Sequence, residues 1–190
     1  MPRLISQRKR GATNGDFGGL VGGFRFGAKV GGISEDGGGA AVKDDERSPA
    51  LRQALEKRAE PFVLSAEEVR SLLAPAGGPF DSVDHLLTEL TRSTSGLSIP
   101  PISNFHVSCA ALGESGRIFV GVNVEFEHLP LPCALHAEQF LILNCFQRRE
   151  TSIEKLCISH VPCGHCRQFM CELHKSEQLE ITILGRDGER

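Results

Sequence analysis

Apolar residues recur at helical intervals in the middle of the chain. The spacing predicts a helix with one buried face, formed by Val83, Leu86, Leu87 and Leu90. Another helix is predicted to begin at Ser65, because a serine followed three residues later by Glu68 forms a capping box. Both patterns indicate helices that pack one face against a core.

After Pro101 the apolar residues form the shorter runs that are typical of strands. Runs over residues 105–112 and 117–122 flank the turn from Gly113 to Gly116, so we expect a hairpin. The patterns that follow predict a helix over 134–147, a strand over 155–160, a helix over 163–174 and a strand over 179–184. Parallel strands need such crossover helices. The expected fold is an α/β sandwich in which at least part of the sheet is parallel.

The first 60 residues lack this patterning. Residues 11–39 contain twelve glycines, and ordering such a backbone costs more entropy than its few apolar side chains can offset. Six basic residues against one acidic residue in the first 34 would suit an organelle transit peptide, but the glycine-rich composition favours a solvated tail. We expect residues 1–60 to be a disordered extension and residues 61–190 to form one domain.

Composition argues against several classes of protein. A formal net charge of -3 gives no general attraction to nucleic acid, so no nucleic-acid partner is expected. No apolar run approaches the roughly 20 residues that cross a bilayer, so no membrane partner is expected. Seven cysteines, an odd number, without a secretory signal indicate reduced thiols in the cytosol.

Cys163 and Cys166 stand three residues apart, directly after Pro162, where a helix is predicted to begin. Both sulfurs would project from one face and could clamp a zinc ion. The free amides and the dipole of a helix start favour the thiolate form that binds metal. Taken alone, the pair fits a redox dithiol or half of a structural zinc site equally well.

A second motif precedes this pair by 27 residues. His136 offers a neutral imidazole as a third ligand. Glu138 is two residues further on, about 200° around a helix, so it cannot bind the same ion from the same face and is left free for proton transfer. A His-x-Glu followed by Pro-Cys-x-x-Cys is the pattern of zinc-dependent deaminases. One alternative is a closed structural site in which Cys133 supplies a fourth ligand.

Four segments resemble motifs of the cytidine deaminases, specifically the homodimeric two-domain kind of bacteria and plants. They stand in that family's order and spacing and are Ile102-Ser103-Asn104-Phe105, Gly121-Val122-Asn123-Val124-Glu125-Phe126, His136-Ala137-Glu138-Gln139 and Pro162-Cys163-Gly164-His165-Cys166-Arg167-Gln168-Phe169. The resemblance implies a three-layer α/β/α sandwich with a mixed sheet, and a homodimer. Because members of that family extend further, we expect residues 61–190 to be a catalytic domain that is incomplete on its C-terminal side, with a last strand lacking neighbours and no second domain.

The resemblance also implies an activity and roles for individual residues. The reaction would be the zinc-dependent hydrolysis of cytidine or deoxycytidine to uridine or deoxyuridine and ammonia, a step of pyrimidine salvage, with one zinc ion per chain. The ion would be held by His136, Cys163 and Cys166, with Glu138 moving protons. Phe105 would stack on the pyrimidine, and Asn123 and Glu125 would bind the ribose hydroxyls.

Two other functions stay open at this point. A truncated, catalytically impaired paralogue would keep the site residues without turnover. A cytosine deaminase acting on nucleic acid would use the same zinc chemistry, but it would need a basic channel and aromatic platforms, and the chain has no Trp and no Tyr.

Overall fold

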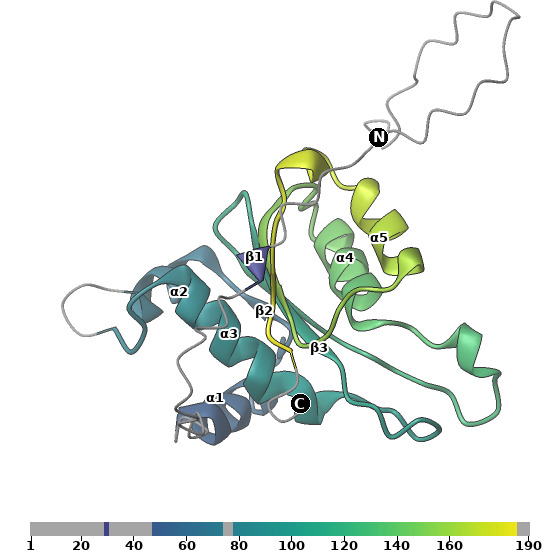
Figure 1. Cartoon of the computed structure of the whole chain (residues 1–190). Coiled ribbons are helices and arrows are strands. Elements are labelled where there is room, and N and C mark those ends of the chain that lie inside the picture. The colour runs from purple at the N-terminus through teal and green to yellow at the C-terminus, as the bar shows by residue number, and fades with distance from the viewer. Residues whose placement is uncertain (1–28, 31–46, 74–77, 186–190) are drawn as a thin grey trace, which may run out of the picture.

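A computed structural model describes residues 29–30, 47–73 and 78–185 of the chain (Figure 1). This part forms a six-stranded sheet in the order β1-β6-β5-β3-β4-β2. The strands are β1 Lys29–Val30, β2 Val63–Leu64, β3 Ser108–Gly113, β4 Ile118–Val122, β5 Ile153–Ile158 and β6 Glu180–Ile183. The α-helices are α1 Arg47–Glu56, α2 Ala66–Leu72, α3 Val83–Thr94, α4 Ala137–Gln147 and α5 Gly164–Cys171, and short 3-10 helices cover η1 Ser95–Leu97, η2 Leu131–Cys133 and η3 Ser176–Gln178.

The sheet is mixed, as predicted. Strand β3 pairs antiparallel with β4, which confirms the hairpin, and also antiparallel with β5. Strands β5 and β6, which the helix α5 connects, run parallel.

The helices cover both faces of this sheet and complete three layers (Figure 1). Helices α4 and α5 lie on one face, and α1, α2 and α3 lie on the other. Alternate side chains of a strand enter opposite cores. On β3, Cys109 and Ala111 join the core formed with α4 and α5, whereas Ala110 joins the core formed with α3. The expected α/β/α sandwich is therefore confirmed.

Local signals define the two helices that were predicted first. At α2 the Ser65 hydroxyl accepts a hydrogen bond from the Glu68 amide, and the Glu68 carboxylate accepts one from the Ser65 amide, which confirms the capping box. At α3 the predicted apolar face packs into the core: Leu86, Leu87 and Leu90 are buried, and Val83 is partly buried against them. No helix in the described part of the chain has the length and apolar character that a membrane span requires.

The N-terminal boundary differs from the expected one. Helix α1 lies within the segment 1–60 that was expected to be disordered, and its Leu55 is 2% exposed in the core around α3. The physical reason is a long-range contact: Leu55, and Leu51 one helical turn before it, pack into the core around α3. Strand β1 pairs with β6 over two residues, so β6 is not without a neighbour on that side. The rest of 1–46 lies outside the described residues.

Candidate metal centre and cleft

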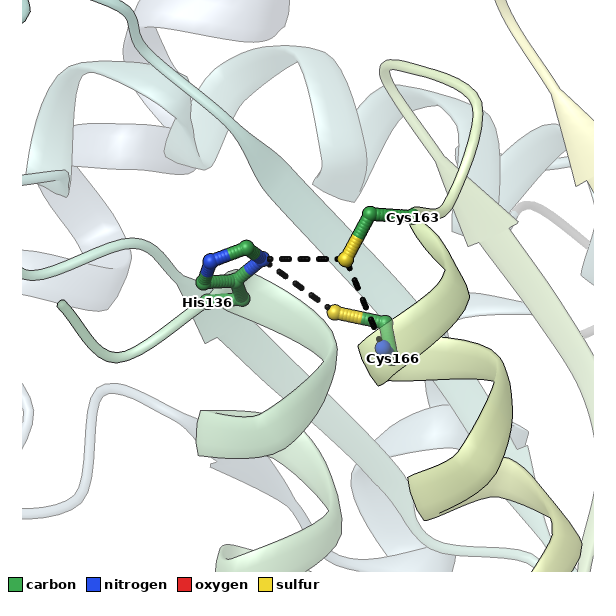
Figure 2. Close-up of side chains that lie close together, drawn as sticks. All are labelled: His136, Cys163 and Cys166. Carbon is green, nitrogen blue, oxygen red and sulfur yellow. Dashed lines mark hydrogen bonds between the residues drawn. The ribbon is translucent and has the colours of Figure 1, made fainter. Parts of the chain in front are cut away.

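His136, Cys163 and Cys166 lie together although they come from two helices (Figure 2). His136 is the capping residue before α4, Cys163 is the capping residue before α5, and Cys166 lies in the first turn of α5. The Nδ1 atom of His136 is 3.5 Å from the sulfur of Cys163 and 3.3 Å from the sulfur of Cys166. The structure thus brings together all three of the predicted metal ligands.

Their spacing fits a tetrahedral zinc ion. Zinc bonds of about 2.0 to 2.1 Å to nitrogen and about 2.3 Å to sulfur, at the tetrahedral angle, separate the two donor atoms by about 3.6 Å. The observed nitrogen–sulfur distances of 3.3 and 3.5 Å are close to this value. One imidazole and two thiolates would leave the fourth position open, which is the composition of a catalytic zinc site and not of a closed one.

The four-ligand alternative through Cys133 does not match this geometry. Cys133 ends the 3-10 helix η2 and is exposed. Among the described residues, the group whose donor atoms all lie within 4.8 Å of one another contains His136, Cys163 and Cys166 without Cys133. A nearby imidazole also distinguishes the pair from a simple redox dithiol.

Glu138 lies beside the ligand group without joining it. It is 4% exposed, and its carboxylate lies close enough to the Cys166 thiol to interact with it electrostatically. Burial raises the pKa of that thiol well above its usual range, and the negative charge of Glu138 raises it further. A bound cation would reverse the balance, because its charge stabilises the thiolate.

A cleft of about 360 Å³ opens next to the ligand group. This volume is within the usual range for small-molecule sites, about 300 to 1,000 Å³. Its lining includes the predicted site residues Phe105, Asn123, Glu125, His136, Glu138 and Cys163. Cys166 lies behind them and is fully buried.

Backbone pairing beyond the end of β4 brings these residues into one cleft. Val124 exchanges two backbone hydrogen bonds with Leu135, each 2.9 Å long. This antiparallel bridge places His136, the next residue, beside the segment that carries Asn123 and Glu125. On the other side, the amide of Glu125 donates to the carbonyl of Ile99 at 2.8 Å.

Glu125 holds the loop that precedes β3. Its carboxylate accepts hydrogen bonds from the amides of Ile102 and Ser103, both at 2.9 Å, and from the Ser103 hydroxyl. The Ser103 hydroxyl, followed by these amides, lowers the pKa of Glu125, so the carboxylate stays ionised. Ser103 was within a recognised motif but had no role assigned, since its partner is 22 residues away in sequence.

Asn123 holds the next part of the same loop. Its side-chain oxygen accepts from the Val107 amide and its side-chain nitrogen donates to the Phe105 carbonyl, both at 2.8 Å. This loop explains why β3 begins at Ser108, three residues later than the predicted strand. An Asn amide has two donors and two acceptor sites, so one of each remains for a ligand.

The ring of Phe105 packs against His160 at the edge of the cleft. The ring centroids are 4.6 Å apart with an interplanar angle of 52°. The Nδ1 atom of His160 is 2.9 Å from the Ser159 hydroxyl, which also accepts from the Ser108 amide at 3.1 Å. The sequence did not single out His160, because a histidine after a strand has no periodic signal. Its position before Pro162 and Cys163 is the one feature that could have suggested it.

Comparison with known proteins agrees with this geometry. Residues 82–179 match the family model described as the cytidine and deoxycytidylate deaminase zinc-binding region. Cytidine deaminase 1 of Arabidopsis thaliana is 42% identical over 122 residues, which cover 64% of this chain and 40% of that protein. The cytidine deaminase of Yersinia pestis (strain Pestoides F) is 36% identical over 137 residues, which cover 72% of this chain and 46% of that protein.

A solved structure supports the fold alone. The crystal structure of cytidine deaminase from Burkholderia pseudomallei aligns with a TM-score of 0.50 at 24% identity, covering 57% of this chain and 89% of that chain. The present chain spans less than half the length of the two curated relatives above. Because the family model covers residues 82–179, just over half of the 190 residues, the chain belongs to the cytidine and deoxycytidylate deaminase family, whose defining region binds zinc.

Proposed function

We propose that this protein hydrolyses the 4-amino group of free cytidine and deoxycytidine, producing uridine or deoxyuridine and ammonia. The observation that carries the proposal is one cleft whose wall contains two of the three zinc-ligand residues, His136 and Cys163, together with the unligated carboxylate of Glu138. Such a set combines a metal site with an open position and an independent acid–base group.

His136, Cys163 and Cys166 would hold the zinc ion, one per chain. When bound, zinc supplies a Lewis acid that lowers the pKa of water and so provides a nucleophile near neutral pH. Glu138 would take one proton from the attacking water and deliver it to N3 of the cytosine ring. It would then take the second proton of that water from the new hydroxyl group on C4 and pass it to the amino group, which leaves as ammonia while the C4 carbonyl forms. Its low exposure keeps competing bulk water away from these transfers.

The remaining cleft residues suit a nucleoside. Phe105 offers an aromatic face for the pyrimidine, and its contact with His160 restrains the ring. Asn123 keeps one donor and one acceptor for a ribose hydroxyl, and the ionised Glu125 accepts strongly from such a group.

The charge of the cleft favours a nucleoside over a nucleotide or a nucleic acid. Of the described residues, those that line it include no Lys and no Arg, whereas Glu125 and Glu138 are both present. A phosphate group in this cleft would meet two carboxylates, with no Lys or Arg among the described lining residues to pair with it. Cytidine and deoxycytidine carry no phosphate and fit this constraint.

A homodimer is part of the proposal. Apolar side chains on the loops at and near the cleft are exposed by 46 to 75%, and they are Ile99, Ile102, Phe126, Leu129, Leu131 and Val161. An apolar surface of this kind favours a protein partner, and we propose a second copy of the chain. Molar mass measured by light scattering should be twice that of one chain, and a monomeric mass at every concentration would contradict this part.

We also propose a location in the cytosol and a role in pyrimidine salvage. The two thiolate ligands must stay reduced to bind zinc. All seven cysteines are free thiols.

The activity can be tested with the zinc-loaded protein and four substrates: cytidine, deoxycytidine, cytidine monophosphate and a single-stranded cytosine oligonucleotide. The expected result is equal amounts of uridine and ammonia from cytidine, a comparable result with deoxycytidine, and much slower turnover of the phosphorylated substrates. Turnover of the oligonucleotide alone would favour a nucleic-acid deaminase. No turnover of any substrate by fully zinc-loaded protein would indicate an impaired paralogue.

A further inference from the structure

The side chain of Gln139 connects the two helices that carry the metal ligands. It lies in the first turn of α4 and is 3% exposed. Its Oε1 atom accepts a hydrogen bond from the backbone amide of His136 at 3.1 Å. Its Nε2 atom lies 3.1 Å from Nδ1 of His165, which stands between Cys163 and Cys166 in the first turn of α5.

The direction of both hydrogen bonds follows from the chemistry of the partners. A backbone amide can only donate, so the Gln139 atom that faces His136 must be the oxygen. The nitrogen therefore faces His165 and donates to Nδ1, which must act as an acceptor. A carboxylate at position 139 could accept from the His136 amide but could not donate to Nδ1 of His165, and a hydrocarbon side chain could make neither hydrogen bond.

His165 is held from a second side. Its ring packs edge to face on Phe169, with ring centroids 5.2 Å apart, one turn further along α5. The chain of contacts thus runs from the main chain of His136 through a buried amide to the turn that contains both cysteines. To bind one zinc ion, Nδ1 of His136 must stay 3.3 to 3.5 Å from the sulfur atoms of Cys163 and Cys166, although the histidine and the cysteines belong to different helices.

We propose that Gln139 is a positioning residue that, through His165, fixes the His136 ligand against the Cys163 and Cys166 ligands and so sets the affinity of the site for zinc. This proposal rests on the zinc site of the proposed function but not on its substrate. Partners that orient metal ligands in this way typically change metal affinity by about 10 to 100-fold when they are removed.

The test is the zinc dissociation constant of the full chain, measured by competition with a chromogenic chelator. Gln139→Leu removes both hydrogen bonds at nearly constant volume and should weaken zinc binding by about 10 to 100-fold. His165→Phe keeps a ring against Phe169 but removes the Nδ1 acceptor, so it should also weaken binding. His165→Asn places an acceptor oxygen near the former Nδ1 position and should retain an affinity close to that of the parent protein.

Gln147→Leu is the matched control, because Gln147 is an exposed glutamine at the other end of the same helix. It should leave zinc affinity unchanged. If Gln139→Leu lowers the thermal stability of the metal-free protein but leaves zinc affinity at the parent value, its role is merely structural and the proposal fails. If Gln139→Leu does not fold, equal affinities for His165→Phe and His165→Asn would overturn the proposal. Normal zinc binding without turnover of cytidine would instead contradict the proposed function and leave this inference standing.

Discussion

The carbonyl oxygen of Ala137 lies 2.1 Å from the position that a β-carbon on Gly121 would occupy. The β-carbon of Leu141 lies 2.7 Å from the same position. Gly121 is on β4, which lies between β3 and β2, and Ala137 begins α4, so the missing side chain lets the start of this helix rest directly on the sheet. This close approach sets the distance between α4 and the sheet, and with it the positions of His136 and Glu138 at the cleft.

We predict that Gly121→Ala destabilises the protein, because either the strand or the helix must move to admit the methyl group. Overpacking of this kind costs about 1 to 3 kcal/mol, or more where backbone is the obstacle. Denaturant unfolding of the metal-free protein measures this. Gly164→Ala is the control, since the nearest atom to its added β-carbon is 3.9 Å away. Equal unfolding free energies for Gly121→Ala and the parent would refute the role of the contact.

The identity of the ligands predicts different effects for two exposed cysteines. Cys163→Ser should lose most of its bound zinc, because an alcohol does not replace a thiolate ligand near neutral pH. Cys133→Ser should keep the zinc content of the parent, because Cys133 lies outside the ligand group. The zinc content of each variant, measured by elemental analysis after dialysis, distinguishes the three-ligand site from the four-ligand site. Loss of zinc from Cys133→Ser would instead support the closed four-ligand site.

Acid sensitivity should come in part from Glu68. The Arg58 guanidinium, 2.6 Å away, together with the Ser65 amide lowers the pKa of Glu68 from 4.5 to about 2. Because the pKa in the folded state is below the unfolded value, this carboxylate stabilises the fold above about pH 4.5, and the contribution is lost as the pH falls toward 2.

Glu68→Gln should therefore lower the free energy of unfolding at neutral pH and flatten its dependence on pH between 4.5 and 2. Equilibrium unfolding of the metal-free protein at several pH values across this interval measures the slope of the unfolding free energy against pH. The same substitution at the exposed Glu67, in the same turn, is the matched control. A slope for Glu68→Gln equal to that of the parent would show that the pair with Arg58 does not contribute.

The elements that could be predicted from sequence are those with a local signal. The capping box at Ser65 and the apolar face of α3 depend on residues three or four positions apart, so no distant contact is needed to define them. The metal-ligand residues also have a local signal, because His136 and Cys163 stand at helix starts that the sequence already indicated.

The features that the sequence did not reveal depend on contacts between distant segments. Helix α1 becomes ordered because Leu55 packs into the core around α3, which no periodicity over ten residues could establish. The clamp between Ser103 and Glu125 and the packing of Phe105 on His160 join residues that are far apart in the chain. The bridge of Gln139 to His165 similarly requires that α4 and α5 lie side by side.

The central claim is that a zinc ion and the carboxylate of Glu138 act together on cytidine. The most direct test is the turnover of cytidine by Glu138→Gln compared with the parent, in samples shown to hold equal amounts of zinc. Since Glu138 is not a ligand, the variant should bind zinc normally and lose about 10² to 10⁴-fold or more of its turnover with the loss of acid–base catalysis. Turnover close to that of the parent at equal zinc content would contradict the account.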